Sequence, residues 1–160
     1  MIWNISGYDV LLDDEDYERL KEFRYSVGKY TLDRQGRFYF RRNLYVDSKR
    51  TTISLHRDIM GCVYGDGETV DHKDGNTLDC RKENLRFSTH AENMRNCKIY
   101  TNNTSGIKGV QWHTRIGKWT AQIRVDGVLK HLGYHADIKD AEAAYTKASK
   151  EFHGEFRRVT

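Results

Sequence analysis

Apolar and polar residues alternate strictly over residues 119–125. The apolar positions are Trp119, Ala121, Ile123 and Val125. Because successive side chains of a strand point to opposite faces of its sheet, this alternation predicts a strand with one apolar and one polar face. Similar patterns predict strands at 109–113 and 128–134, and Asp126-Gly127 is typical of a tight hairpin turn between the last two strands.

A helix is expected directly after these strands, over residues 137–153. Its apolar residues recur at helical spacing, and they are Ile138, Ala141, Tyr145, Ala148 and Phe152. Gly154 follows at the position where many helices end. One helix and three strands can bury each other's apolar faces, which leaves the polar face of the sheet free to meet a partner.

The patterns before residue 100 are shorter. Helices are expected from Asp13 or Asp14 through Arg24, over 56–61, and from a cap at Ser88 to about Cys97. Strands are expected over 29–32, 37–46, 51–55 and 69–72, with a turn at 33–36 and a loop at 73–82.

The polar stretch 100–106 separates these two regions. It reads Tyr-Thr-Asn-Asn-Thr-Ser-Gly and has the composition of a linker. We therefore expect an α+β protein with an N-terminal domain at 1–100, whose core lies at about 51–98. A linker at 101–105 and a sheet-plus-helix domain at 106–160 would follow.

Charge changes this picture more by its distribution than by its net value of +4. Acids outnumber bases before residue 34, whereas one acid accompanies seven bases over residues 34–57. Those bases are Arg34, Arg37, Arg41, Arg42, Lys49, Arg50 and Arg57. Such a block suits a polyanion, because bound phosphates release condensed counterions, although a solvated basic face would have the same composition.

The cysteines and the hydropathy pattern indicate the cellular location of the protein. Cys62, Cys80 and Cys97 form no C-x-x-C pair, which disfavours a zinc ribbon and a disulfide scaffold and favours reduced thiols. The sequence has no secretion signal at its start and no stretch long enough to span a membrane. We expect a cytoplasmic protein with no membrane partner, and no protein partner is implied.

The candidate chemistry centres on Asp71, His72, Asn84 and Asn93. A strand carrying His72 and a helix carrying Asn93 could bring both to one point with Asp71. Carboxylate and amide oxygens suit a hard divalent cation, so Asp71 and Asn93 are candidate metal ligands. A neutral His72 beside them could take the proton of an attacking water. This combination can hydrolyse a phosphodiester bond.

Two other histidines are alternatives or accessories. His90 precedes Asn93 by three residues on the expected helix, so it could face the same cluster. His56 begins another expected helix and could either touch a phosphate or serve the structure alone.

This stretch resembles the HNH endonucleases, the ββα-metal nucleases, and in particular their phage and intron-encoded, homing-type branch. The residues that carry the resemblance are Leu55-His56-Arg57, Asp71 to Asn76, Glu83 to Arg86, and Asn93 at the last motif position. The resemblance implies one Mg²⁺ or Mn²⁺ ion and cleavage of double-stranded DNA. It also implies that Asn84 supports catalysis by bracing the loop with hydrogen bonds.

Residues 106–154 resemble the DNA-binding domain of plant ethylene-response factors (APETALA-type), which also occurs fused to phage HNH endonucleases. The resemblance lies in 105–110, 117–119, 121–124, 131–134 and 140–145. It implies a three-stranded sheet in the major groove. The contacts would fall on Lys108, Gln111, His113, Arg115, Gln122, Arg124 and His131. Glutamine or histidine replaces several arginines of the plant pattern and the first hairpin is longer, so site preference does not carry over.

Together these patterns predict a ββα-metal HNH nuclease core followed by a three-stranded antiparallel sheet plus one helix. The protein would nick or cleave double-stranded DNA in the cytoplasm of a phage's host or a bacterium. A DNA-binding protein with a decayed nuclease core and a zinc-stabilised binding module are the alternatives.

Overall fold

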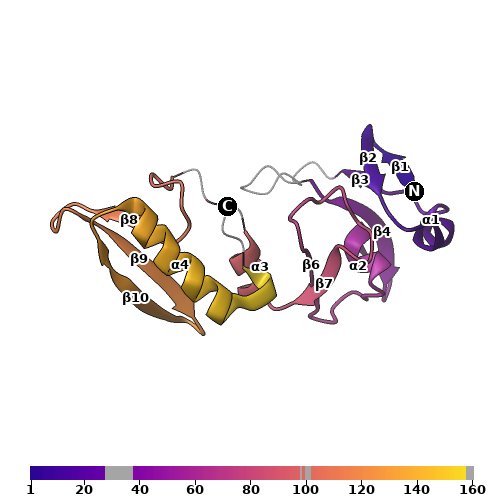
Figure 1. Ribbon diagram of the computed structural model, residues 1–160. Coiled ribbons are helices and arrows are strands. Elements are labelled where there is room, and N and C mark those ends of the chain that lie inside the picture. The colour runs from indigo at the N-terminus through magenta and orange to yellow at the C-terminus, as the bar shows by residue number, and fades with distance from the viewer. Residues whose placement is uncertain (28–37, 98, 100–101, 158–160) are drawn as a thin grey trace. The chain divides into compact units, whose positions relative to one another are not determined.

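The computed structural model describes residues 1–27, 38–97, 99 and 102–157. The chain is α+β, with small antiparallel sheets and short helices (Figure 1). It divides into two compact units, residues 1–91 and 92–160, and each is described here by itself. Their boundary falls inside helix α3 (His90–Asn96), before the expected linker. None of the described helices has the length and apolar content that crossing a membrane requires.

The first unit begins with a hairpin that the sequence patterns did not indicate. Strands β1 (Ile2–Ile5) and β2 (Tyr8–Leu11) pair antiparallel through Ser6 and Gly7. Both turn residues have positive φ, of 55° and 87°, as a two-residue hairpin turn requires. The strands are short and their apolar residues do not alternate cleanly, which is why no periodicity marked them.

Helix α1 (Asp14–Leu20) follows the hairpin and is shorter than the helix expected through Arg24. It starts with acidic residues, which interact favourably with the positive end of the helix dipole. The chain then turns, and the backbone N–H of Phe23 donates to the carbonyl of Leu20. This turn brings Tyr25 into the core, and the Phe23 ring instead faces the guanidinium of Arg42.

A three-stranded sheet with the order β3-β4-β5 comes next, and helix α2 follows it. The elements are β3 (Ser26–Val27), β4 (Phe40–Val46), β5 (Lys49–Ser54) and α2 (Leu55–Ile59). β4, β5 and α2 match the elements expected at 37–46, 51–55 and 56–61 within a few residues. The strand expected at 29–32 and the turn expected at 33–36 lie outside the described residues.

The last hairpin of the first unit consists of β6 (Thr69–His72) and β7 (Leu85–Ser88), which pair antiparallel. β6 has the predicted bounds. No strand was expected where β7 lies, and Ser88 ends this strand instead of capping a helix, so α3 begins at His90. Along the chain, the order is therefore strand, loop, strand, helix.

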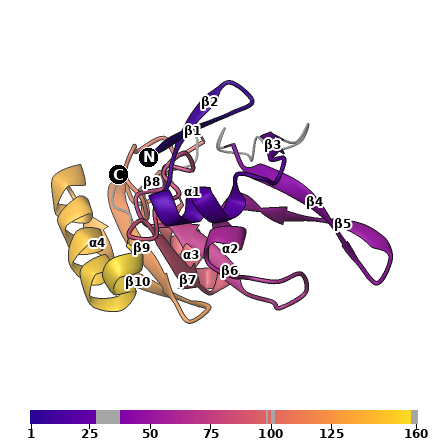
Figure 2. The ribbon, with the colours of Figure 1, turned by 90° about the vertical axis from the view of Figure 1, so that its right-hand side faces the viewer.

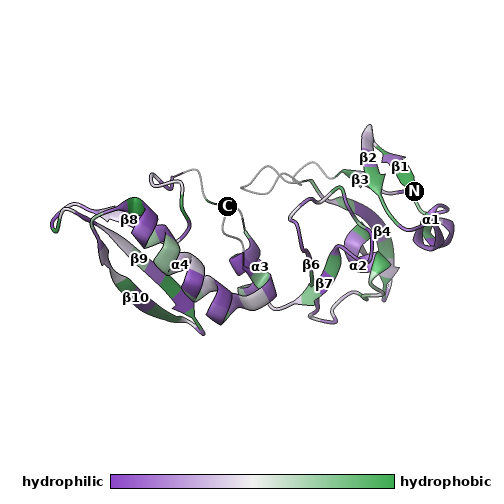
Figure 3. Ribbon diagram, viewed as in Figure 1, coloured by the Kyte–Doolittle hydropathy of each residue, from purple (hydrophilic) through white to green (hydrophobic). Residues whose placement is uncertain are grey.

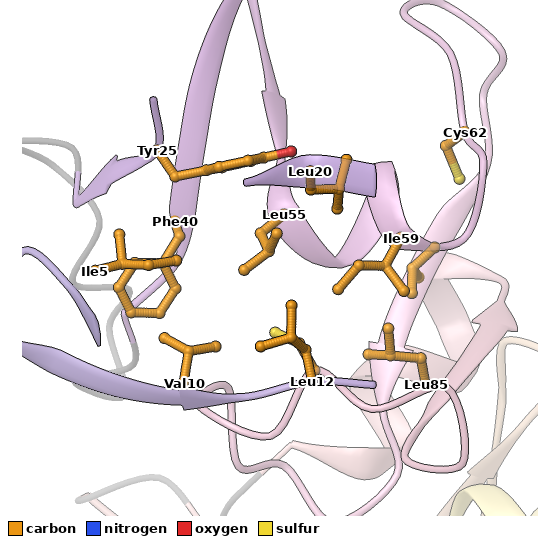
Figure 4. Packing of buried hydrophobic residues seen from close by; sticks show 12 residues of the cluster. Ile5, Val10, Leu12, Leu20, Tyr25, Phe40, Leu55, Ile59, Cys62 and Leu85 are labelled. Carbon is orange, nitrogen blue, oxygen red and sulfur yellow. The ribbon is translucent and has the colours of Figure 1, made fainter. Parts of the chain in front are cut away.

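Apolar side chains from these elements meet in one core, shown in Figure 4. The N-terminal hairpin contributes Ile5 and Val10, α1 contributes Leu20, and α2 contributes Leu55 and Ile59. Helix α1 is hydrophilic over most of its length in Figure 3, so it joins the core through few side chains. Because the contributing segments are far apart in the sequence, the core depends on contacts that local periodicity does not predict.

The second unit contains the sheet and helix that the sequence predicted. The sheet has the order β10-β9-β8, built from β8 (Val110–His113), β9 (Lys118–Val125) and β10 (Val128–His135). Helix α4 (Ile138–His153) lies on one face of this sheet, and the short 3-10 helix η1 (Gly154–Phe156) follows. The expected turn at Asp126-Gly127 is present, with positive φ at both residues. Ala121 and Ile123 are buried against the helix, as the alternation indicated.

The described part of the expected linker is an ordered turn attached to β8. The side-chain oxygen of Asn103 accepts hydrogen bonds from the backbone N–H groups of Ser105 and Gly106. The hydroxyl of Ser105 donates to the carbonyl of Val110 at 2.7 Å. A polar composition therefore marks a hydrogen-bonded turn here, because Asn and Ser side chains satisfy the backbone locally.

Gly109 allows α4 to approach the sheet closely. Its φ is +72°, and a Cβ atom there would lie 2.2 Å from the Tyr145 ring and 2.6 Å from the carbonyl oxygen of Gln122. We predict that Gly109→Ala lowers the free energy of unfolding of the second unit by at least about 2 kcal/mol, because strain and overpacking add. Urea denaturation followed by tryptophan fluorescence, in which Trp112 and Trp119 report on this unit, would measure this loss.

Gly117→Ala is the matched control for Gly109→Ala. Its φ is +67° and nothing lies within 4 Å of the added Cβ, so only the backbone strain of about 1–2 kcal/mol should remain. Equal losses for the two variants would show that the contact with Tyr145 contributes nothing.

Candidate functional site

His72 is the last residue of β6, and its side chain is only 3% exposed. It lies opposite Leu85 of β7 in the hairpin register. The backbone carbonyl of His72 accepts a hydrogen bond from Gly75 at 2.9 Å, and Gly75 has a φ of 72°. The chain therefore turns sharply after His72, and 74–76 form the turn that their composition suggested.

Other polar and aromatic groups surround the imidazole of His72. The sulfur of Cys80 lies 3.7 Å from Nε2. The ring of His56 lies 5.1 Å away between centroids, and the ring of Tyr39 lies 6.4 Å away. Burial raises the pKa of the Cys80 thiol to about 12, so the thiol stays protonated at neutral pH. Cys62, Cys80 and Cys97 are all free and buried, as expected.

His56 lies in the first turn of α2 and is buried beside His72. Burial holds the pKa of His56 well below its ordinary value, and positive charge on His72, Arg57 or Arg41 lowers it further. His56 is therefore neutral at physiological pH. It is buried beside the His72 ring, and a contact of His56 with a phosphate stays a prediction.

Asn84 holds the loop between β6 and β7 in shape. Its amide nitrogen donates to Oδ1 of Asp74 and to the carbonyl of Asp79, both at 2.9 Å. Its amide oxygen accepts from the backbone N–H of Asp74 at 3.2 Å. These bonds join the two ends of the loop, and the backbone N–H of Lys73 also donates to the Asn84 carbonyl. Asn84 therefore braces the loop without reaching the imidazole.

The N-terminal hairpin holds the other side of the same loop. The backbone N–H of Leu11 donates to the carbonyl of Leu78, and the N–H of Cys80 donates to the carbonyl of Leu11. Leu11 and Asp79 form a parallel bridge. This pairing fixes the backbone of Cys80, whose sulfur then contacts His72.

Asp71 forms a buried ion pair with Arg86 directly across the hairpin. The two guanidinium nitrogens lie 2.9 and 3.2 Å from Oδ2 of Asp71, and both side chains are buried. Such a pair compensates the buried carboxylate, and removal of one member would leave an uncompensated charge. The sequence analysis did not foresee Arg86 as the partner of a candidate metal ligand.

The donor chemistry fits a hard divalent cation. Asp71 offers carboxylate oxygen, and Asn93 offers amide oxygen from α3. Mg²⁺ is commonly held by one or two such groups, with water and phosphate completing its shell. In the described residues no group of three His, Cys, Asp or Glu side chains is arranged to hold a metal.

The two candidate metal ligands on α3, His90 and Asn93, differ in exposure, and they belong to different units of the chain. His90 begins the helix, is exposed and belongs to the first unit. Asn93 is half-buried and belongs to the second unit. That Asn93 joins Asp71 at one ion therefore stays a prediction from the sequence pattern.

In the second unit, strand register brings most of the expected DNA contacts to the sheet face opposite α4. On neighbouring strands Gln111 lies opposite Thr120, and Gln122 lies opposite His131. His113 and Arg124 point to the same face by alternation. Arg124 also donates to the carbonyl of Gly127 at 2.6 Å.

Tyr134 completes this face and was missed by the sequence analysis. It lies opposite Thr120, and its ring lies 4.5 Å from that of His131 and 5.4 Å from that of His113. A bulge between His131 and Gly133 shifts the alternation of β10, which hides Tyr134 from a simple period of two.

The structure gives Lys108 a different partner from the one expected. Its ammonium donates to the carbonyls of Arg95 and Cys97, at 2.6 and 2.9 Å, at the end of α3. A lysine is favourable there because it neutralises the negative end of the helix dipole. These bonds tie Lys108 to the end of α3, and Arg115 lies in the turn between β8 and β9. Contacts of Lys108 and Arg115 with DNA stay a prediction from the resemblance.

Comparison with known proteins gives two matches. Residues 55–95 match a family model described as HNH endonuclease. Protein 3.8 of Escherichia phage T7 is 34% identical over 92 residues, which are 58% of this chain and 75% of that protein. No solved structure matches the chain. The family match contains His56, Asp71, His72, Asn84, Arg86 and Asn93.

The buried state of His56 predicts a pH dependence of stability. Its folded pKa lies below the ordinary value of 6.5, so the unfolded chain binds the proton more readily. Stability is therefore expected to fall as the pH drops below about 6.5, by up to about 1.4 kcal/mol per pH unit from this group. Urea denaturation between pH 7 and 5 would show a shallower slope for His56→Phe. His90→Gln, which removes an exposed histidine of the same unit, should keep the wild-type slope. If His56→Phe also keeps that slope, other groups cause it.

Proposed function

The chain belongs to the HNH endonuclease family, and on that premise we propose that it hydrolyses phosphodiester bonds of double-stranded DNA with one divalent metal ion. The observation that carries the proposal is the environment of His72 inside the matched range. His72 ends a buried strand directly after Asp71 in the sequence, and the loop that follows it is braced by Asn84.

His72 would act as the general base. With its proton on Nε2, facing the Cys80 sulfur, the ring presents Nδ1 as an acceptor for the proton of a water molecule. The protonated thiol cannot compete as a base, because burial keeps its pKa high. His56 lies beside this ring, with 5.1 Å between the ring centroids, and because it is neutral it places no positive charge against the imidazolium that would form when His72 takes the proton.

Asp71 and Asn93 would hold the metal, as Mg²⁺ or Mn²⁺. When bound, the ion would stabilise the negative charge that develops on the phosphate and on the leaving oxygen. Arg86 already neutralises Asp71, so its guanidinium would share that carboxylate with the ion. Asn84 would contribute by positioning the backbone that follows His72.

The second unit would direct cleavage by binding DNA. Its sheet face opposite α4 gathers Gln111, His113, Gln122, Arg124 and His131, side-chain types that donate to or accept from base edges and phosphates. One active site cuts one strand, so a single chain would nick a duplex. A cytoplasmic location, in the host of a phage or in a bacterium, fits this activity and stays a prediction.

We predict that His72→Ala loses nicking on the order of 100- to 10,000-fold while it retains DNA affinity, because only the proton acceptor is removed. Supercoiled plasmid with Mg²⁺, with and without chelator, measures the activity, and anisotropy with a labelled duplex in chelator measures binding. Wild-type protein that binds DNA without nicking it would favour the alternative of a DNA-binding protein with a decayed nuclease core.

The metal ligand on α3 can be tested separately. Asn93→Ala is expected to raise the Mg²⁺ concentration needed for half-maximal nicking at least about tenfold and to reduce the rate, whereas Asn93→His should keep partial activity because imidazole also binds divalent ions. His90→Ala is the control on the same helix. Loss of activity in His90→Ala with a harmless Asn93→Ala would assign the ligand to His90 instead.

A further inference from the structure

The β4–β5 hairpin has one face that the core does not use. β4 presents Arg41, Asn43 and Tyr45 there, and β5 presents Arg50 and Thr52, all of them exposed. The register places Asn43 opposite Thr52 and Tyr45 opposite Arg50, so these side chains form neighbouring pairs. Figure 2 shows the far end of this hairpin projecting away from α1 and α2.

The opposite face of the hairpin fixes its orientation. Phe40 and Ile53 are buried, and the guanidinium of Arg42 pairs with Asp58 of α2. The hydroxyl of Tyr25 donates to the same carboxylate. Because these contacts tie the base of the hairpin to α2, its exposed face is presented at a defined angle.

The chemistry of the exposed face suits nucleic acid. Its exposed side chains carry two guanidinium groups, one amide and two hydroxyls, those of Thr52 and Tyr45, and no carboxylate. Arginine and asparagine are the side chains that pair with guanine and adenine edges in the major groove. Tyr45 is 73% exposed, so its aromatic ring is accessible to a partner.

The face also leads to the candidate catalytic histidine. Arg41 lies opposite Ser54, and α2 with His56 begins directly after that residue. The ring of His56 is 5.1 Å from that of His72.

We propose that this face of the β4–β5 hairpin lies in the major groove of the DNA duplex beside the cleaved bond and contacts its bases. The proposal rests on the proposed nuclease function and adds a second DNA-reading surface, in the first unit. A two-stranded ribbon fits a groove about 12 Å wide. Arg41 to Tyr45 spans roughly 14 Å at ~3.4 Å per residue, the length of about four base pairs.

Two neighbouring lysine and arginine residues provide a matched test. Arg50 belongs to the proposed face and Lys49 to the opposite one, and both are exposed on β5. The probe is a duplex of about 30 base pairs centred on a nick position mapped with the wild-type protein, bound in chelator so that it stays uncut. Arg50→Ala and Tyr45→Ala should each weaken binding about 5- to 20-fold, and Lys49→Ala less than about twofold. Circular dichroism checks that each variant is folded.

Methylation of guanine N7 by dimethyl sulfate tests the groove. Interference with wild-type binding is expected at guanines within about four base pairs on one side of the nick, and it should disappear for Arg50→Ala at one or more of them. Equal affinities for Arg50→Ala and Lys49→Ala, or no interference in that interval, would overturn the proposal. Nicking by the wild-type protein is measured in a separate assay. If no nicking is observed, the binding measurements use a random-sequence duplex in place of the mapped probe. The proposed DNA contact of the hairpin and the proposed nuclease function can then be rejected independently of each other.

Discussion

The first unit depends on the loop between β6 and β7 keeping one shape. Asn84 bonds to both ends of that loop, and Leu11 pairs with its middle from the N-terminal hairpin. Each hydrogen bond contributes only about 0.5–1.5 kcal/mol net, but a buried amide left unpaired costs more than that. The loop keeps its shape mainly because another conformation would leave buried polar groups without hydrogen-bond partners. In this shape the sulfur of Cys80 lies against the imidazole of His72 at the end of β6.

Charge in this unit is paired according to burial. The buried carboxylates among the described residues of this unit all have guanidinium partners: Asp16 with Arg19, Asp58 with Arg42, Asp71 with Arg86 and Asp79 with Arg81. Arginines on the outer face of the β4–β5 hairpin face solvent instead. Within the described part of the basic segment, Arg42 and Arg57 form ion pairs with Asp58 and Asp66, whereas Arg41 and Arg50 lie exposed on the hairpin.

Sequence alone predicted most of the second unit and less of the first. The alternation over 119–125, the Asp126-Gly127 turn and the stripe of α4 are local signals, and the structure has all three. β1, β2 and β7 are short, and their pairing depends on partners distant in the chain, so no period revealed them. For the candidate site, motif spacing selected residues around His72, but it could not show that Arg86 neutralises Asp71 or that Lys108 turns toward α3. Side-chain direction of that kind is set by packing.

The bond from Lys108 to the last carbonyls of α3 bears on how this chain can be recombined. Arg95 of the same helix also lies 3.5 Å from Asp126 in the β9–β10 turn. Lys108 and Asp126 contact the last turn of α3, so a junction placed at the polar stretch near residue 100 would separate the helix from these partners. A chimera that receives a new C-terminal sheet would have to carry α3 with it, or supply a lysine and an acidic turn at the equivalent positions. The segment to be exchanged therefore starts inside α3, several residues before the polar stretch whose composition is typical of a linker.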